Sequence, residues 1–266
     1  MPAVLALALP VLAGAAWMAA SGAPAHYWQT NLAALVLASG WIMAGRGPHT
    51  ALSRHMLLAL LLLLMLLPLG LSEPLRSVTG AEVRRWIPLG PVSLHAGMVA
   101  IPPLVMLAAR NKALAAPILL AALLLAFFQP DGASGFAVTF AAIGLHHVTR
   151  DWKVGLVAIV GFVAAIVMSL SGELPPQPFV ERVLVDAAGQ HLVLALMLAA
   201  ALGACFLLFV FATPFTRATR LALAGAFFGF VVMAMMSHYP FPLVGYGAAP
   251  IAGFGLALGL HRIPAR

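Results

Sequence analysis

Charged side chains and cysteine are scarce in this sequence of 266 residues. Asp, Glu, Lys and Arg together make up 8% of the chain, and the single cysteine, Cys205, lies inside an apolar run. Average soluble domains carry about 25% charged residues, so this composition excludes an ordinary soluble domain and a disordered chain. A single cysteine also excludes a disulfide-stabilised scaffold.

Apolar residues are abundant instead, at 63% of the chain, and mean hydropathy is +1.06. The formal net charge of +7 would ordinarily suggest a nucleic-acid partner. Here the basic residues come singly or in pairs between apolar runs, as in the loops of membrane proteins, so we expect no nucleic-acid partner. The runs also lack the two-residue alternation of barrel strands. The sequence therefore predicts an integral membrane protein built from helices.

Ten apolar runs approach or reach the roughly 17–25 residues that a membrane-spanning helix needs. We expect one all-α domain over residues 1–266, a polytopic transmembrane bundle of about ten helices. The first run lacks a basic residue before it, so we expect a retained helix and not a cleaved signal. The second and sixth runs begin with polar residues, so a total of eight or nine membrane spans is the alternative count. The runs are approximately 2–20, 28–45, 55–71, 92–109, 113–128, 132–149, 154–171, 190–212, 218–236 and 241–260.

The basic residues support this count and predict an orientation. With ten spans both termini lie on one side, and placing them in the cytoplasm puts ten Lys and Arg residues inside and four outside. Six of the seven acids then lie outside, and Asp151 alone lies inside. The inner residues are Arg46, Arg54, Arg110, Lys112, Arg150, Lys153, Arg217, Arg220, Arg262 and Arg266.

The first long outer loop, residues 72–91, holds two adjacent arginines followed by a tryptophan. We expect a short helix or strand on the membrane surface, with Trp86 and Ile87 toward the lipid headgroups and Arg84 and Arg85 in water. Guanidinium pairs suit a lipid-linked phosphate. The alternative is a simple interfacial aromatic anchor with flanking charges.

Three acids in the remaining outer segments are candidate functional groups. Asp131 lies at a membrane boundary, where it either serves function or caps the sixth helix. Glu181 and Asp186, in the second long outer loop at residues 171–190, are five positions apart. That offset is about 140° around a helix, so one can face a cavity while the other faces solvent.

Two further patterns complete the reading of the residues. Proline and glycine are dense in residues 237–250, which predicts an irregular helix entrance packed within the protein. The histidines near the helix ends, among them His146, His147 and His191, lack partners at ligand spacing, so no metal site is expected.

Taken in order, four of these segments resemble motifs of the SEDS family (shape, elongation, division and sporulation). Arg84–Pro91 is similar to its "RRWI-x-LGP" signature, and Gln129–Gly132 to its "QPD-x-GT" segment. Leu174-Pro175 with Gly189–Leu192 resembles the two ends of its "LPE…GEEL" loop. Pro242–Gly247 looks like its terminal "PF-[IV]-SYGG" motif. The resemblance extends from about residue 84 to residue 260.

This resemblance implies a ten-helix protein of the bacterial cytoplasmic membrane with both ends inside. It implies a glycosyltransferase that polymerises a lipid-linked cell-wall precursor of the lipid II type at the outer face, with release of undecaprenyl diphosphate. Family members usually work with a penicillin-binding-protein-type transpeptidase, so the implied partners are that protein, the lipid-linked sugar and membrane lipids. A divalent cation at the diphosphate is compatible with such chemistry, and no residue pattern indicates one.

The resemblance also assigns roles to residues. The family's presumed catalytic aspartate in "LPE-x-HTDF" has no clear match, because the loop here is longer, and Glu181 is our substitute, with Asp186 second. A carboxylate would act as general base on the attacking sugar hydroxyl. The implied substrate contacts are Arg84, Arg85, Trp86, Asp131 and Tyr246.

Several polar groups of the family pattern are replaced. The "QPSE" stretch reads His95–Met98, its following lysine position is Ile101, and the "GEEL" acids are Gln190 and His191. The replacement of these polar groups supports an alternative, a non-catalytic SEDS-like subunit that binds a partner's transmembrane helix or a polyprenyl lipid. A transporter or flippase is a third hypothesis, but such proteins use polar groups near mid-helix, and these helices have almost none.

Overall fold

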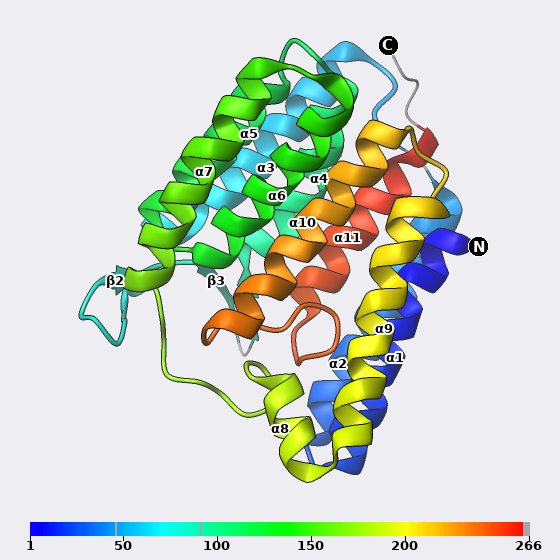
Figure 1. Ribbon diagram of the computed structural model, residues 1–266, viewed down its shortest axis with the longest axis vertical. Helices are drawn as coiled ribbons and strands as arrows, with labels where there is room; N and C mark the ends of the chain where they lie inside the picture. The colour runs from blue at the N-terminus through cyan, green and yellow to red at the C-terminus, as the bar shows by residue number, and fades with distance from the viewer. Residues whose placement is uncertain (46, 91, 263–266) are drawn as a thin grey trace.

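The computed structural model describes residues 1–45, 47–90 and 92–262, which form a helical bundle with a few short strands (Figure 1). Arg46 and Arg266, counted above at the inner side, lie outside the described residues, as does Pro91. The helices are α1 Pro2–Ala20, α2 Ala25–Ala44, α3 Ala51–Leu71, α4 Ala96–Arg110, α5 Ala115–Phe128, α6 Gly132–Thr149, α7 Trp152–Ser171, α8 Val183–Gln190, α9 Leu192–Phe211, α10 Arg217–Met236 and α11 Ala248–Gly259, followed by the 3-10 turn Leu260–Arg262.

The expected all-α bundle is confirmed, since every predicted run overlaps one helix and α8 is a short addition. By length and composition, α1, α3, α7, α9 and α10 can each cross a membrane. Helices α4, α5 and α11 are apolar but shorter. The exact number of crossings stays a prediction.

Two predicted helix starts are wrong. The run 92–109 begins with a strand, β4 (Val92–His95), which pairs antiparallel with β3 (Trp86–Leu89). A second small antiparallel pair joins β1 (Leu75–Arg76) to β2 (Glu82–Val83). The run 241–260 becomes helical only at Ala248, because the preceding proline- and glycine-rich segment is irregular, as the sequence predicts.

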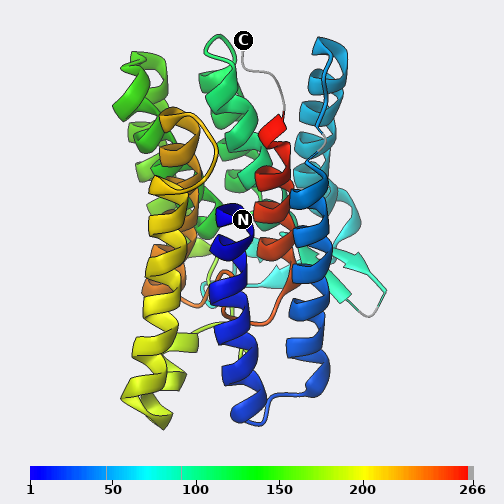
Figure 2. The same cartoon turned by 90° about the vertical axis from the view of Figure 1, so that its right-hand side faces the viewer.

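The strands and α8 lie at the end of the bundle opposite the N-terminus and the 3-10 turn Leu260–Arg262 (Figure 1). We name these the outer end, which carries the strands and α8, and the inner end, which carries the N-terminus and the 3-10 turn. Helix α1 packs against α2 and α9, and the turned view shows the three helices side by side (Figure 2).

The core of the bundle is α4, buried on all sides over residues 96–108, together with the tightly packed pair α6 and α10. Glycines permit the close approach in that pair. A Cβ atom at Gly225 would lie 2.2 Å from the carbonyl oxygen of Phe140, and one at Gly229 would lie 2.4 Å from that of Phe136. Packing through small residues is how helices associate in lipid.

Candidate functional site

The outer loop 72–95 folds back on itself, and this brings two functional side chains together. In the β3–β4 pair, Trp86 lies opposite His95, and their rings meet edge to face with centroids 5.4 Å apart. The turn between the strands includes Gly90 at a φ of 66°, a conformation that glycine adopts without strain. The hairpin therefore carries Arg85 and Trp86 back to the start of α4.

Arg85 is buried, with 1% of its surface exposed, which corrects the expectation that both arginines stay in water. Its guanidinium carbon lies 4.6 Å from the ring centre of Trp86 and 4.4 Å from that of Tyr239. One Nη atom also donates to the carbonyl oxygen of Pro130 at 3.5 Å. A guanidinium is weakly hydrated and stacks on aromatic faces, which explains how this cation is tolerated inside.

Arg84 points elsewhere and remains about one-third exposed. It pairs with Glu82 at 3.3 Å and donates to the carbonyl oxygen of Leu69 at 3.2 Å. The two adjacent arginines thus differ in role: one is a fixed interior cation and the other is accessible.

Asp131 and His95 cap two neighbouring helices and face each other. Asp131 accepts from the backbone N–H of Ser134 at 3.2 Å and so caps α6, while Nδ1 of His95 accepts from the N–H of Met98 at 3.3 Å and caps α4. The remaining atoms, Oδ2 of Asp131 and Nε2 of His95, lie 3.7 Å apart in the interior. The predicted helix cap at Asp131 is confirmed, and its functional role stays a prediction.

The protonation state of His95 follows from this geometry. Because Nδ1 accepts a hydrogen bond, we assign the ring proton to Nε2, on the side of Asp131. Burial lowers the pKa of His95 to about 4, and the negative charge of Asp131 opposes that shift only in part. A neutral imidazole therefore faces the buried carboxylate at neutral pH.

Glu181 lies just before α8 and is buried, with 6% of its surface exposed. Its Oε2 accepts from the backbone N–H of Gln177 at 2.7 Å. Burial raises the pKa of Glu181 to about 7, while the Gln177 bond and the positive charge of Arg85 pull it down. A carboxyl group that titrates near neutral pH can take up a proton from a substrate and release it again.

Two adjoining cavities open at this end. The larger has a volume of about 530 Å³ and is lined by both arginines, Trp86 and Glu181. The smaller, of about 310 Å³, is lined by His95 and Tyr246, among others, and shares Trp86 with the larger. The larger cavity, which has charged side chains in its lining, thus adjoins the smaller cavity, which has several aromatic ones.

Hydrogen bonds and an ion pair join the segment that precedes α8, the segment that precedes α11 and helix α2 around these cavities. The N–H of Tyr246 donates to the carbonyl oxygen of Phe179 at 2.7 Å, and His238 pairs with Glu173 at 2.9 Å. The Asn31 side chain, buried on α2, donates to the carbonyl oxygen of Gly245 at 2.8 Å and accepts from the N–H of Gly247 at 3.0 Å. These contacts fix the irregular segment that carries Tyr239 and Tyr246.

Most of the residues selected from the sequence gather here. Arg84, Arg85, Trp86 and Glu181 line the larger cavity, and Tyr246 lines the smaller one. Asp131 belongs to the buried cluster beneath them. Asp186 is exposed on α8 and lines neither cavity. The expectation that the two acids lie on one helix is wrong, because Glu181 precedes α8, which begins at Val183.

Sequence reasoning missed Tyr239, His95 and Gln177 as members of the site. Tyr239 is fully buried, covers Arg85 and accepts from the N–H of Gly132 at 3.2 Å. Its position in the proline-rich segment was the available signal, because an irregular backbone at membrane depth needs polar partners. Across the described ranges, no three His, Cys, Asp or Glu residues gather in a way that could hold a metal ion.

Comparison with known proteins links this architecture to one solved fold. No family model matches the sequence, and no curated protein matches it either. The structure is similar to the crystal structure of the rod shape determining protein RodA of Thermus thermophilus, with a TM-score of 0.67, 20% sequence identity, and coverage of 98% of this chain and 95% of that one. An aspartate-to-alanine mutant of that RodA matches with the same TM-score and identity, over 98% of this chain and 96% of that one.

Proposed function

With the fold of a RodA protein as the premise, we propose that this chain is a compact SEDS-type glycosyltransferase that polymerises a lipid-linked cell-wall precursor of the lipid II type. The observation that carries the proposal is the 530 Å³ cavity at the outer end, which is lined by a buried carboxyl group and two arginines. The expected setting is the outer face of the bacterial cytoplasmic membrane, together with a penicillin-binding-protein-type transpeptidase.

Glu181 is the general base in this mechanism. Its carboxylate takes the proton of the attacking sugar hydroxyl while the hydroxyl oxygen forms a bond to the anomeric carbon of a second lipid-linked sugar. The bond from that carbon to the diphosphate oxygen breaks, and polyprenyl diphosphate leaves with the electron pair. The pKa of Glu181, raised to about 7 by burial, gives the group a basicity suited to this exchange.

The arginines offset the charge that develops on the leaving diphosphate. Arg84 is accessible and can contact phosphate oxygens directly. Arg85 is held between two rings and supplies a fixed positive charge beside Glu181. Trp86 and Tyr246 offer flat apolar faces on which sugar rings can rest, while Asp131 positions the α4–α6 junction through its cap.

One observation favours the alternative of a non-catalytic subunit that binds a partner's transmembrane helix or a polyprenyl lipid. Asp131 is fully buried and lines neither cavity, and among the described residues that line the larger cavity only Glu73 and Glu181 are acids. A site with so few acids is also what a subunit that binds lipid without reacting would need.

Polymer formation from lipid II by the purified full chain, with and without its cognate transpeptidase, decides between these functions. We expect Glu181→Gln to lower the rate by about 10²- to 10⁴-fold, the usual contribution of a general base. Asp186→Asn, which removes an exposed carboxylate that lines neither cavity, is the matched control.

Asp186→Asn tests the second candidate base in the same assay. If Asp186→Asn abolishes polymerisation and Glu181→Gln does not, the base is assigned to the wrong acid. If the wild-type chain makes no polymer even with its partner, the subunit hypothesis replaces the glycosyltransferase.

A further inference from the structure

The smaller cavity at the outer end, of about 310 Å³, differs in chemistry from the larger one beside it. Its described lining holds no Asp, Glu, Lys or Arg, whereas two arginines and two acids line the larger cavity. A charged ligand in the smaller cavity would lose its water without gaining an ion pair to those residues, which is unfavourable. The lining therefore favours an uncharged ligand.

A stack of two tyrosines forms one wall of this cavity. The rings of Tyr27, on α2, and Tyr246, before α11, lie nearly parallel, at 7°, with their centroids 3.8 Å apart. The ring of His26 meets both edge to face, with centroid distances of 4.8 Å to Tyr27 and 6.2 Å to Tyr246. The hydrogen bonds of Asn31 join the same two segments of the chain. The wall is thus formed before a ligand arrives, which reduces the entropy lost on binding.

Uncharged polar groups accompany the rings. Tyr27, Tyr246 and Gln177 line the cavity, and among the contacts of the described residues their phenol and side-chain amide groups have no hydrogen-bond partner. A hydroxyl and an amide can each donate and accept. A sugar ring has apolar C–H faces and a rim of hydroxyl groups. Aromatic rings together with uncharged donors and acceptors match both of these features.

Gln177 connects this cavity to the proposed general base. Gln177 lines both cavities, and its backbone N–H donates to Oε2 of Glu181 at 2.7 Å. A sugar held by the side-chain amide of Gln177 therefore lies at the border with the cavity that contains Glu181. The arginines line only the larger cavity, which suits it to the sugar that carries the departing diphosphate.

We propose that the smaller cavity binds an uncharged sugar ring, packed on the Tyr27–Tyr246 wall and hydrogen-bonded to the side-chain amide of Gln177. The part that this sugar plays rests on the proposed function: it is the acceptor, whose hydroxyl is presented to Glu181, while the donor and its diphosphate occupy the larger cavity. Tyr27 and Gln177 are then acceptor-binding residues.

Binding of N,N′-diacetylchitobiose, a soluble uncharged disaccharide, to the purified full chain in detergent tests the site without any reaction. Saturation-transfer NMR gives the dissociation constant. We expect Tyr27→Ala to weaken binding about tenfold, because the ring contact is lost. Tyr27→Phe, which keeps the stack, should retain most of the affinity. Gln177→Ala should weaken binding about three- to tenfold, because it removes the amide and keeps the N–H that holds Glu181.

Gln29→Ala is the matched control for these variants. Gln29 is exposed on the same helix as Tyr27 and lines neither cavity, so its removal should leave sugar binding unchanged. Gln177 is exposed on a loop, so Gln177→Ala still tests the site if Tyr27→Ala fails to fold. Absence of binding to the wild-type chain, or equal losses for Gln177→Ala and Gln29→Ala, would overturn the sugar site.

Polymerisation kinetics separate this inference from the proposed function. With lipid II as substrate, Gln177→Ala should raise KM about three- to tenfold and change kcat by less than about twofold, because it removes a binding contact and not the base. The disaccharide should also inhibit the wild-type chain. Polymer formation that the disaccharide leaves unchanged, with an unaltered KM in Gln177→Ala, would overturn the acceptor role and leave the glycosyltransferase in place. A wild-type chain that binds the disaccharide through Tyr27 and makes no polymer would overturn the glycosyltransferase and support the sugar site.

Discussion

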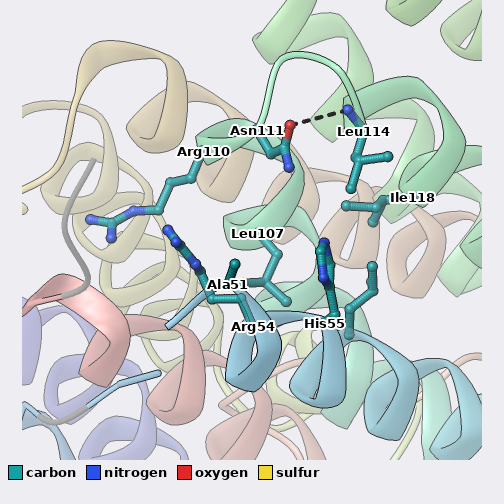
Figure 3. Close-up of a pocket in the computed structure, with 9 residues that line it drawn as sticks. Ala51, Arg54, His55, Leu107, Arg110, Asn111, Leu114 and Ile118 are labelled. Carbon is teal, nitrogen blue, oxygen red and sulfur yellow. Dashed lines mark hydrogen bonds between the residues drawn. The ribbon is translucent and has the colours of Figure 1, made fainter. Parts of the chain in front are cut away.

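The two ends of the bundle hold their cations in opposite ways. At the outer end, Arg85 is buried between two aromatic rings, and the carboxyl group of Glu181 lies within its electrostatic reach. At the inner end, Arg54 and Arg110 share a partly open pocket whose described lining has no acid (Figure 3). At the outer end a buried cation thus lies beside a carboxyl group of opposite charge, whereas at the inner end two cations lie close enough to repel each other.

Removal of Arg85 should produce the largest loss of stability. In Arg85→Ala, two ring contacts and a carbonyl hydrogen bond disappear, and Glu181 loses its nearby positive charge. We expect the free energy of unfolding in detergent to fall by about 3 kcal/mol. Arg84→Ala, the matched control, should cost less than about 1 kcal/mol, because its ion pair with Glu82 is exposed. Equal losses would mean that the buried cation is no different from a surface one.

The pH dependence of stability should show an intermediate effect. The folded-state pKa of Glu181, about 7, lies above its usual value of 4.5, so the contribution of Glu181 to stability falls as pH rises between these values. The folded-state pKa of His95, about 4, lies below its usual 6.5, so the contribution of His95 rises as pH increases from 4 to 6.5. The two trends oppose each other in the wild-type chain.

Glu181→Gln separates these trends. Melting temperatures measured from about pH 4.5 to pH 8 should rise more steeply up to pH 6.5 in the variant than in the wild-type chain, because only the His95 contribution remains. Above pH 7 the variant should be the more stable relative to wild type, since residue 181 then carries no buried negative charge. Parallel curves for the two proteins would contradict the raised pKa.

The smallest effect is expected at the inner end. Arg54→Gln removes one cation from a like-charged pair, so the relief of repulsion offsets the loss of its bond to Thr50. We expect the free energy of unfolding of the lipid-free protein to change by no more than about 0.5 kcal/mol. A loss near that of Arg85→Ala would show that the inner arginines are structural and would remove the contrast between the two ends.

The bundle was readable from the sequence, and parts of the site were not. Long apolar runs are a direct requirement of the bilayer, so the helices could be located from them. The burial of Arg85 could not, because its two rings come from positions 86 and 239, and only the folded chain brings them together. The contact between His95 and Asp131 could not be predicted for the same reason, since each residue looks like an ordinary helix cap when considered alone.

Asn31 has a consequence for how the protein is made. Its side chain holds the backbone at Gly245 and Gly247, more than 210 positions farther along the chain. During synthesis α2 leaves the ribosome long before the segment with Gly245 and Gly247, to which Asn31 forms hydrogen bonds. A nascent chain cut before residue 240 would therefore contain most of the helices and lack both partners of Asn31.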